Sequence, residues 1–251
     1  MPVLFVSHGA PTLALDDIAG ADFARLAGEL PRPRSVLVIS AHWEATPARI
    51  GTTRTGHIVH DFAGFPRELY AVRYDAPGAP ALASRVGELL GVPHDDARPW
   101  DHGVWVPLLR LWPDAGIPVL QLALPSRSTP PDLFELGRRL APLREEGVLV
   151  LASGGMVHDF GSIDWIGDSP PPSFALEFER WVRRTLLARD WPRLLRFATD
   201  TPHHRRAHPT DEHFLPLLIA AGAASTTDPT VTFPIEGFEL GSLSRLAVRF
   251  D

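Results

Sequence analysis

The chain has 251 residues, a formal net charge of -6 and no cysteine. The lack of cysteine excludes disulfides, iron–sulfur clusters and cysteine nucleophiles, so any metal has to be bound by His, Asp or Glu. Every cationic side chain apart from histidine is an arginine, which excludes Schiff-base catalysis by lysine, and the acidic balance offers no basic surface for nucleic acid. Neither a signal peptide nor an apolar stretch long enough to span a membrane stands out, so we expect a cytoplasmic protein without a membrane partner.

Apolar strand-like segments alternate with helical patterns along the chain. We expect a helix that Asp16 or Asp17 caps and that runs to about Glu29. Further strands and helices are expected as follows: strands at 3–7, 35–41, 70–74, 118–124 and 148–153, and helices at 79–90, 130–141 and 173–189. This alternation is typical of an α/β fold with a mostly parallel central sheet and helices on both faces. Segments 231–237 and 244–251 predict a C-terminal antiparallel extension, and we expect one catalytic domain over 1–251.

Three of the strand-like segments lead into a histidine. His8, His42 and His158 follow V-L-F-V-S, S-V-L-V-I-S-A and V-L-V-L-A-S-G-G-M-V. In an open α/β sheet the ligand crevice lies at the carboxyl ends of the strands, where a histidine can act as metal ligand or base. A single histidine of this kind is most often a polar cap, but three in one chain favour a shared site. A metal enzyme is therefore the first hypothesis.

Other histidines lie in segments that suit the same crevice. His213 precedes an apolar run that ends at Gly222, and Pro216 is tolerable only in the first helical turn, so we expect His213 at a helix N-terminus. His60 and His102 lie in Gly-rich, aromatic loops that suit substrate binding, although a bond to the backbone is an equal alternative. Four aromatic residues lie near these histidines in the sequence: Trp43, Phe62, Phe65 and Trp105. We expect them to line an apolar slot for a flat ring, with ordinary core packing as the alternative.

Six ordered motifs then resemble a known family. They read F-V-S-H-G-A-P, V-I-S-A-H-W, H-D-F-A-G-F-P, W-D-H-G-V-W, A-S-G-G-M-V-H-D and P-T-D-E-H-F-L-P-L, and together they resemble the DOPA 4,5-dioxygenase branch of the class III extradiol ring-cleavage dioxygenases. That family includes the catalytic subunit of protocatechuate 4,5-dioxygenase. The pattern departs at Gly154 or Gly155, where relatives have Asn, and at Asp159, where they have a neutral polar residue. These departures concern the pocket wall and hence the substrate.

The resemblance implies a set of roles. One divalent metal ion per chain would be bound by His8, His42 and His213, with His158 as the catalytic base. His102 would contact the substrate or oxygen, and we add His60, Trp43 and Phe65 as substrate-binding candidates. The partners would be a small catechol and O2, with Fe(II) for activity and Zn(II) as a metal that purified protein can carry. A catechol must lose protons to bind a metal through both oxygens, and a neutral histidine is a suitable acceptor.

Two alternatives stay open at this point. Three histidine ligands with an open position are also a zinc hydrolase pattern, in which His158 would activate a metal-bound water. The fold could also persist in a non-enzymatic binding protein, although the intact set of four histidines weighs against it. The sequence leaves open the natural catechol, the position of ring cleavage and the oligomeric state.

Overall fold

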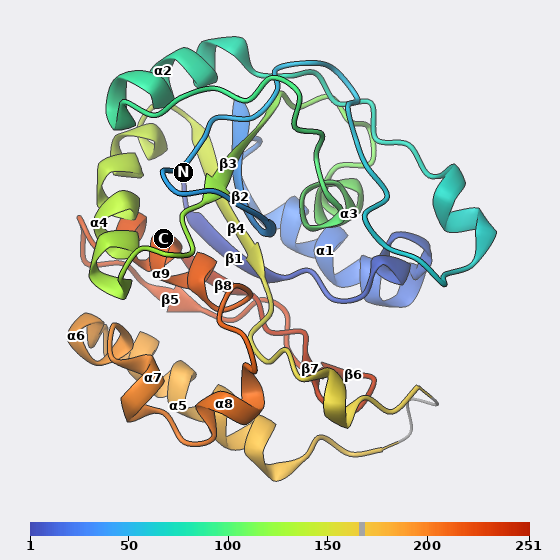
Figure 1. Ribbon diagram of the computed structural model, residues 1–251, viewed down its shortest axis with the longest axis vertical. Helices are drawn as coiled ribbons and strands as arrows, with labels where there is room; N and C mark the ends of the chain where they lie inside the picture. Colours follow the sequence, from blue (N-terminus) through green and yellow to red (C-terminus); the bar gives the residue numbers. More distant parts are fainter. Residues whose placement is uncertain (166–168) are drawn as a thin grey trace.

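The computed structural model describes residues 1–165 and 169–251. Its main sheet has six strands in the order β3-β2-β4-β1-β8-β5 (Figure 1). Four of these strands are parallel to one another: β1 (Val3–Ser7), β2 (Ser35–Glu44), β3 (Val119–Leu124) and β4 (Val148–Gly154). At the other side of β1, β8 (Val248–Phe250) pairs antiparallel to it, and β5 (Val231–Thr232) pairs antiparallel to β8. The predicted α/β class, with its mostly parallel sheet and antiparallel extension, is confirmed.

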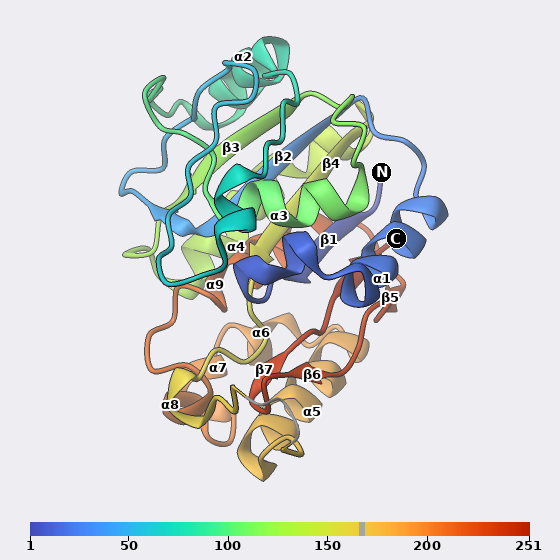
Figure 2. The same cartoon turned by 90° about the vertical axis from the view of Figure 1, so that its right-hand side faces the viewer.

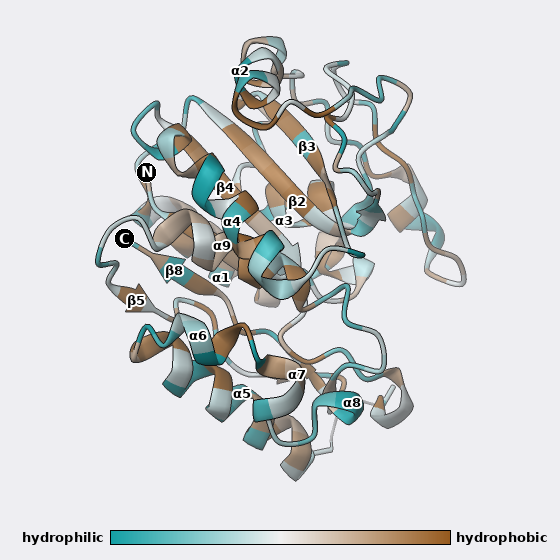
Figure 3. Cartoon of the chain, turned by 60° about the vertical axis from the view of Figure 1, so that its left-hand side comes forward, coloured by the Kyte–Doolittle hydropathy of each residue, from teal (hydrophilic) through white to brown (hydrophobic). Residues whose placement is uncertain are grey.

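Helices cover both faces of this sheet, as expected (Figure 2). One face packs against α2 (Pro80–Leu90), α4 (Pro130–Leu140) and α9 (Leu215–Ala224). The opposite face packs against α1 (Asp17–Glu29) and α3 (His102–Leu111), with the 3-10 helix η1 (Pro11–Leu15) beside them. Asp16 caps α1 by accepting hydrogen bonds from two backbone N–H groups, as the sequence predicts. The strands are largely hydrophobic in Figure 3 because both faces are buried.

The remaining elements lie beyond the end of the sheet, in the lower part of Figure 1. They include α5 (Ser173–Leu187) and three short helices, namely α6 (Trp191–Leu194), α7 (Phe197–Asp200) and α8 (His204–Ala207). A small hairpin of β6 (Phe238–Glu239) and β7 (Leu243–Ser244) lies near them, as does the 3-10 helix η4 (Phe160–Ser162). None of the helices in the described ranges is long and apolar enough to cross a membrane.

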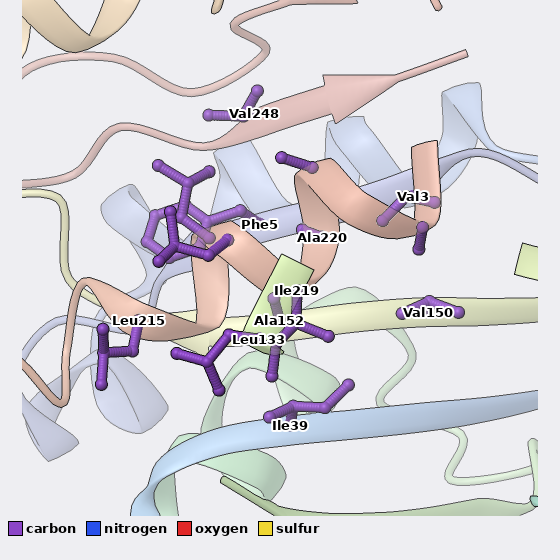
Figure 4. Close-up of a cluster of buried hydrophobic side chains, with 14 of the residues drawn as sticks. Val3, Phe5, Ile39, Leu133, Val150, Ala152, Leu215, Ile219, Ala220 and Val248 are labelled. Carbon is purple, nitrogen blue, oxygen red and sulfur yellow. The ribbon is translucent and has the colours of Figure 1, made fainter. Parts of the chain in front are cut away.

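All residues of helix α9 are buried, and the helix packs directly against the sheet. Its side chains Leu215, Ile219 and Ala220 meet Val3, Phe5 and other strand residues in Figure 4. Gly222, which the sequence suggests as a helix stop, lies inside α9. A Cβ at this position would lie 2.0 Å from the backbone oxygen of Phe134 in α4. The glycine therefore allows two buried helices to approach closely.

Two local predictions are wrong. The strand expected at 70–74 is instead the end of the 3-10 helix η2 (Arg67–Ala71) followed by extended chain, and its apolar residues reflect the burial of Leu69 and Tyr74. His102, expected in a loop, is the first residue of α3. Gly103 and Pro107 disfavour a helix there, but almost every residue of α3 is buried under the sheet, so tertiary packing overrides propensity.

Candidate metal centre

Five histidines from separate elements meet at the carboxyl edge of the parallel strands. His8 follows β1 directly, His42 lies near the end of β2 beyond an irregularity in its pairing, and His213 lies in the turn before α9. His102 begins α3, and His158 lies four residues beyond β4. The structure thus brings together the four histidines that the sequence places at strand and helix ends, and adds His102 to them. We call these five residues the histidine floor.

Three of them offer nitrogens to a common point. His8, His42 and His213 place one ring nitrogen each within 4.8 Å of one another, and the Nε2 atoms of His8 and His42 are 3.0 Å apart. Two other sets meet the same distance limit, namely His42 with Asp61 and His102, and His158 with Glu212 and His213. Only the first set consists of three histidines, which is a donor set that Fe(II) and Zn(II) both accept.

The outer nitrogens of two of these histidines have fixed partners. The Ser153 hydroxyl donates to the Gly103 carbonyl oxygen, so it accepts from His8 Nδ1, which lies 2.9 Å away. His213 Nδ1 lies 2.8 Å from Glu212 Oε1, and an ionised carboxylate can only accept. In both rings Nδ1 therefore carries the hydrogen, and Nε2 carries the lone pair that a metal needs.

A buried nitrogen without a hydrogen-bond partner also indicates a metal site. His213 Nε2 is buried and has no hydrogen-bond partner among the described residues. Buried polar atoms are almost always paired, so such an atom needs an explanation. A metal ion bound by His8, His42 and His213 would supply the missing partner, and these residues therefore fit a metal cofactor.

Burial keeps these rings neutral. Desolvation, followed by the neighbouring His42, lowers the pKa of His8 well below its ordinary value. Burial and the nearby His102 lower the pKa of His42 to about 4, and burial lowers that of His213 to about 3 although Glu212 opposes the change. All three rings are therefore unprotonated at neutral pH, which is the form that binds a metal.

Glu212 is a site residue that the sequence does not identify. Adjacent residues of a helix point about 100° apart, so Glu212 beside His213 in the sequence cannot settle whether a carboxylate joins the metal ligands. The two residues lie in a turn instead, where the carboxylate reaches the ring of its neighbour. Burial acts to raise the pKa of Glu212, but hydrogen bonds from His213, the backbone and Thr210, together with the charge of His213, outweigh it and the pKa falls to about 2.

His158 lies beside the proposed ligand His213 rather than within the set of three. The two rings are stacked, with 3.4 Å between centroids and 10° between planes. Burial lowers the pKa of His158 to about 4 although Glu212 opposes the change, so the ring is neutral at pH 7. The His158 backbone N–H donates to Ala207 at 2.9 Å, which ties the segment after β4 to α8.

His102 is oriented by a carboxylate. Asp61 Oδ1 accepts from His102 Nδ1 at 2.9 Å and from the backbone N–H of His102 at 3.0 Å. Burial acts to raise the pKa of Asp61, but these hydrogen bonds lower it to about 2. The sequence motif contains Asp61 only as the neighbour of His60. The His-Asp pair in that loop is the one signal that could have identified it.

A buried carboxylate, Asp101, supports His42 from behind. Asp101 is fully buried and accepts from the Ser40 hydroxyl and the Gln121 amide, each at 2.6 Å. Arg98 lies 3.3 Å from Asp101 and donates to the His42 carbonyl oxygen at 2.9 Å. This network holds the end of β2 in place, and no local sequence signal marks it.

A cavity of about 250 Å³ opens above the histidine floor. Its walls include Phe62 and Phe65, and its outer part is lined by five residues that we call the apolar mouth: Phe160, Ile163, Trp165, Leu240 and Leu243. Phe65 lies where the sequence predicts a wall for a flat ring. Trp43, His60 and Trp105 do not line this cavity. His60 lies against Phe62, Tyr70 and Trp105 with Nε2 3.3 Å from the Val72 oxygen, and Trp43 is buried beside Arg98.

Comparisons with known proteins agree with this geometry. A family model described as the catalytic LigB subunit of aromatic ring-opening dioxygenase matches residues 3–250. The chain is 40% identical to an Escherichia coli K12 protein named 4,5-DOPA dioxygenase extradiol, over 99% of this chain and 94% of that protein. It is 38% identical to a Beta vulgaris protein of the same name, over 88% and 85% of the two chains. A crystal structure of an uncharacterized Escherichia coli K12 protein superposes with a TM-score of 0.82 at 35% identity and covers 100% of both chains.

Proposed function

The chain belongs to the family of catalytic LigB subunits of aromatic ring-opening dioxygenases, and from this premise we propose that it is a metal-dependent extradiol dioxygenase that opens the ring of a small catechol. The observation that carries the proposal is the set of His8, His42 and His213, whose nitrogens meet at the base of an apolar cavity. Both atoms of O2 would enter the product.

We assign the metal to these three histidines and expect Fe(II) to be the active ion. When bound, Fe(II) supplies the electron transfer between catechol and dioxygen that ring cleavage requires. Zn(II) accepts the same three nitrogens, so purified protein can carry zinc without turning over. Glu212 and Ser153 orient two of the rings, and the buried Asp101 network holds the strand that carries the third.

His158 is the proposed acid and base. Its pKa of about 4 leaves the ring neutral at pH 7, so it can accept a proton from a catechol hydroxyl above the floor and return it later. The stacking of its ring on the proposed ligand His213 supports a position beside the substrate, and outside the three ligands, for His158. His102, whose Nδ1 is held by Asp61, presents its other nitrogen for contact with the substrate or oxygen.

The aromatic walls exclude water and hold the ring. Phe62 and Phe65 line the cavity and contact each other edge to face, with 5.4 Å between ring centroids. A flat apolar wall of this kind suits the face of an aromatic substrate. His60 and Trp43 have no such position, and we assign them a supporting role behind the walls.

The proposal is tested with purified protein reconstituted with Fe(II) under nitrogen. Consumption of one O2 per catechol, with a yellow ring-opened product, is expected. Hydrolysis of ester or amide substrates by the zinc form without oxygen uptake would instead select the hydrolase alternative. Binding of catechols without any turnover by the iron form would select a binding protein.

Two variants separate the proposed roles. His158→Ala should keep its metal and lose turnover by about 10² to 10⁴-fold, as for a lost general acid or base. His42→Ala should lose the metal itself. His94→Ala, at an exposed position outside the cavity, is the matched control and should change neither quantity. A His158→Ala protein that arrives free of metal would contradict the assignment of His158 as acid and base.

A further inference from the structure

No side chain in the described ranges orients the ring of His158 through a hydrogen bond. The ring instead stacks on His213 and meets Phe160 edge to face, with 4.5 Å between the ring centroids of His158 and Phe160. A histidine that acts as a base is usually held in position by a further group that bonds to its second nitrogen. Because His158 lacks such a group, its backbone has to place the ring.

The backbone around His158 lies beyond the end of β4, past the last residue that pairs in the sheet. Its hydrogen bonds come from neighbouring elements instead. The Met156 N–H donates to Ser7 Oγ at 3.0 Å, and the His158 N–H donates to the Ala207 oxygen at 2.9 Å. The Met156 carbonyl oxygen accepts from the ring of His208, with Nε2 at 3.0 Å. Helix α8 and the residue that follows it thus hold this segment on one side.

The ring of His208 that donates this hydrogen bond is fully buried. A carbonyl oxygen can only accept, so Nε2 carries the hydrogen. Burial lowers the pKa of His208 to about 3, so the ring is neutral at pH 7 and has only this one N–H. The ring packs against Phe178 and Phe214, with 5.2 and 5.3 Å between centroids, which leaves it little freedom to turn.

The other nitrogen of His208 is unfavourable for stability. Nδ1 is buried and has no hydrogen-bond partner among the described residues. A buried acceptor without a partner destabilises the folded chain, and an apolar side chain in the same place would avoid that loss. A residue that breaks a folding rule in this way is expected where function requires it. The hydrogen bond to Met156 is the contribution that only a donor at this position can make.

His208 lies too far back to contact a substrate itself. His158 lines the cavity and His208 does not, while the hydrogen bond of His208 goes to Met156, two residues before His158. Any influence of His208 on the reaction therefore has to pass through the position of a residue in the cavity. Its ring also contacts Phe214, which follows the proposed ligand His213, so a test has to separate an effect on His158 from an effect on the metal.

We propose that His208 is a positioning residue for the acid and base His158. Its Nε2–H holds the Met156 carbonyl oxygen, and together with the bond from the His158 N–H to Ala207 it fixes the bend from which the His158 ring reaches the cavity. The inference rests on the proposed function, because the reaction of a catechol with O2 is the one that His158 serves.

The test compares two substitutions at this position in protein loaded with Fe(II) under nitrogen. His208→Leu fills the space without donating a hydrogen bond, whereas His208→Gln offers an amide N–H in place of Nε2–H. With catechol as substrate, His208→Leu should lower kcat by about 10 to 100-fold, as for a catalytic group displaced by about 1 Å, and should leave KM and the iron content unchanged. His208→Gln should restore most of the lost kcat.

A double variant shows whether the effect passes through His158. In a chain that already has His158→Ala there is no base left to position, so adding His208→Leu should not lower kcat further. Val182→Ala, which removes part of another fully buried side chain on α5, is the matched control for lost packing. It should lower the temperature of unfolding without lowering kcat.

Amide hydrogen exchange in the zinc-loaded protein tests the same positioning without turnover. The His158 N–H donates to the Ala207 oxygen, and it should exchange about tenfold faster in His208→Leu than in the unaltered protein. His208→Gln should protect it again. Val182→Ala, which lowers stability elsewhere, should leave it protected.

The outcomes separate the two proposals. Normal turnover by His208→Leu, or an equally low kcat in His208→Gln, would overturn the inference. Additive losses in the double variant, or loss of iron from His208→Leu, would overturn it as well, since His208 would then act on another part of the site. If the unaltered iron protein consumes no oxygen with any catechol, the proposed function fails, and the exchange of the His158 N–H still decides whether His208 fixes this segment.

Discussion

The two ends of the cavity are built in opposite ways. The histidine floor is held by hydrogen bonds to Ser153, Glu212 and Asp61, and its residues follow strands or lie at the starts of helices. The apolar mouth consists of residues in or next to the short 3-10 helix η4 and the small hairpin, and two of them are largely exposed. A floor fixed by the fold suits a reaction that does not change, whereas a mouth made of loops can be altered without disturbing the sheet. The chemistry and the choice of substrate therefore depend on separable parts of the chain.

The largest expected difference between the two ends of the cavity is how much each contributes to the loss of folding stability at low pH. Burial lowers the folded-state pKa of His42 and His158 to about 4, and that of His208 behind them to about 3. Between pH 6.5 and about 4 the unfolded chain binds protons that the folded chain does not, so the metal-free protein should lose stability as the pH falls. The slope is up to about 1.4 kcal/mol per pH unit for each such histidine.

Denaturant unfolding of the metal-free protein at pH 7, 6 and 5 measures this loss. The mouth contributes no buried titratable group from its five residues, so the loss should persist in Trp165→Ala. A free energy of unfolding that stays constant from pH 7 to pH 5 would show that the floor is not the acid-sensitive region.

Substitution by alanine should have different effects at two neighbouring glycines, Gly154 and Gly155. A Cβ at Gly154 would lie 2.1 Å from the His213 carbonyl oxygen, whereas a Cβ at Gly155 has its nearest contact at 3.6 Å, to His158. Gly154→Ala should therefore push the His213 turn away from β4, costing about 1 to 3 kcal/mol of stability and most of the metal affinity.

Gly155→Ala is the matched control, since it adds the same methyl group one residue later. It should keep the metal and unfold close to the parent protein. Metal content and thermal unfolding of both variants check the contrast, and equal behaviour would place the constraint elsewhere than at the His213 backbone.

Removal of the carboxylate that orients His213 should have a smaller effect. Glu212→Ala takes away the acceptor of the His213 Nδ1 hydrogen and should weaken metal binding by about 10 to 100-fold, as for other groups that orient metal ligands. Glu212→Gln keeps an oxygen acceptor and should lose less. Competition with a chelator measures both affinities; identical losses would show that the negative charge, and not the hydrogen bond, is what matters.

The smallest effect is expected at the wall between the two ends. Phe65 lines the cavity and is half-buried, so Phe65→Ala should weaken binding of unsubstituted catechol by about fivefold through lost apolar contact. Metal content should not change. Leu187→Ala, at an exposed position on α5, is the control. An unchanged affinity for catechol in Phe65→Ala would remove this residue from the binding surface.

The difference between the two ends of the cavity also explains which parts of the fold and the site can be predicted from the sequence. The parallel strands are marked by apolar runs, and the histidines that follow them are visible because strand ends gather at one edge. Asp61, Ser153 and Glu212 are not visible in this way, because their partners lie far along the chain or depend on a turn rather than a helix. The sequence does not predict the helix that carries His102, because burial stabilises this helix in spite of Gly103 and Pro107.

The order of strands in the sheet has a consequence for the growing chain. Strand β1 lies between β4 and β8, and the three proposed metal ligands lie at positions 8, 42 and 213. During synthesis, at about 5 to 20 residues per second, His8 and His42 leave the ribosome long before His213 does. A nascent chain therefore cannot bring the three proposed ligands together until most of its residues have been made. The timing of translation alone thus keeps the complete set of three histidines from forming on an unfinished polypeptide.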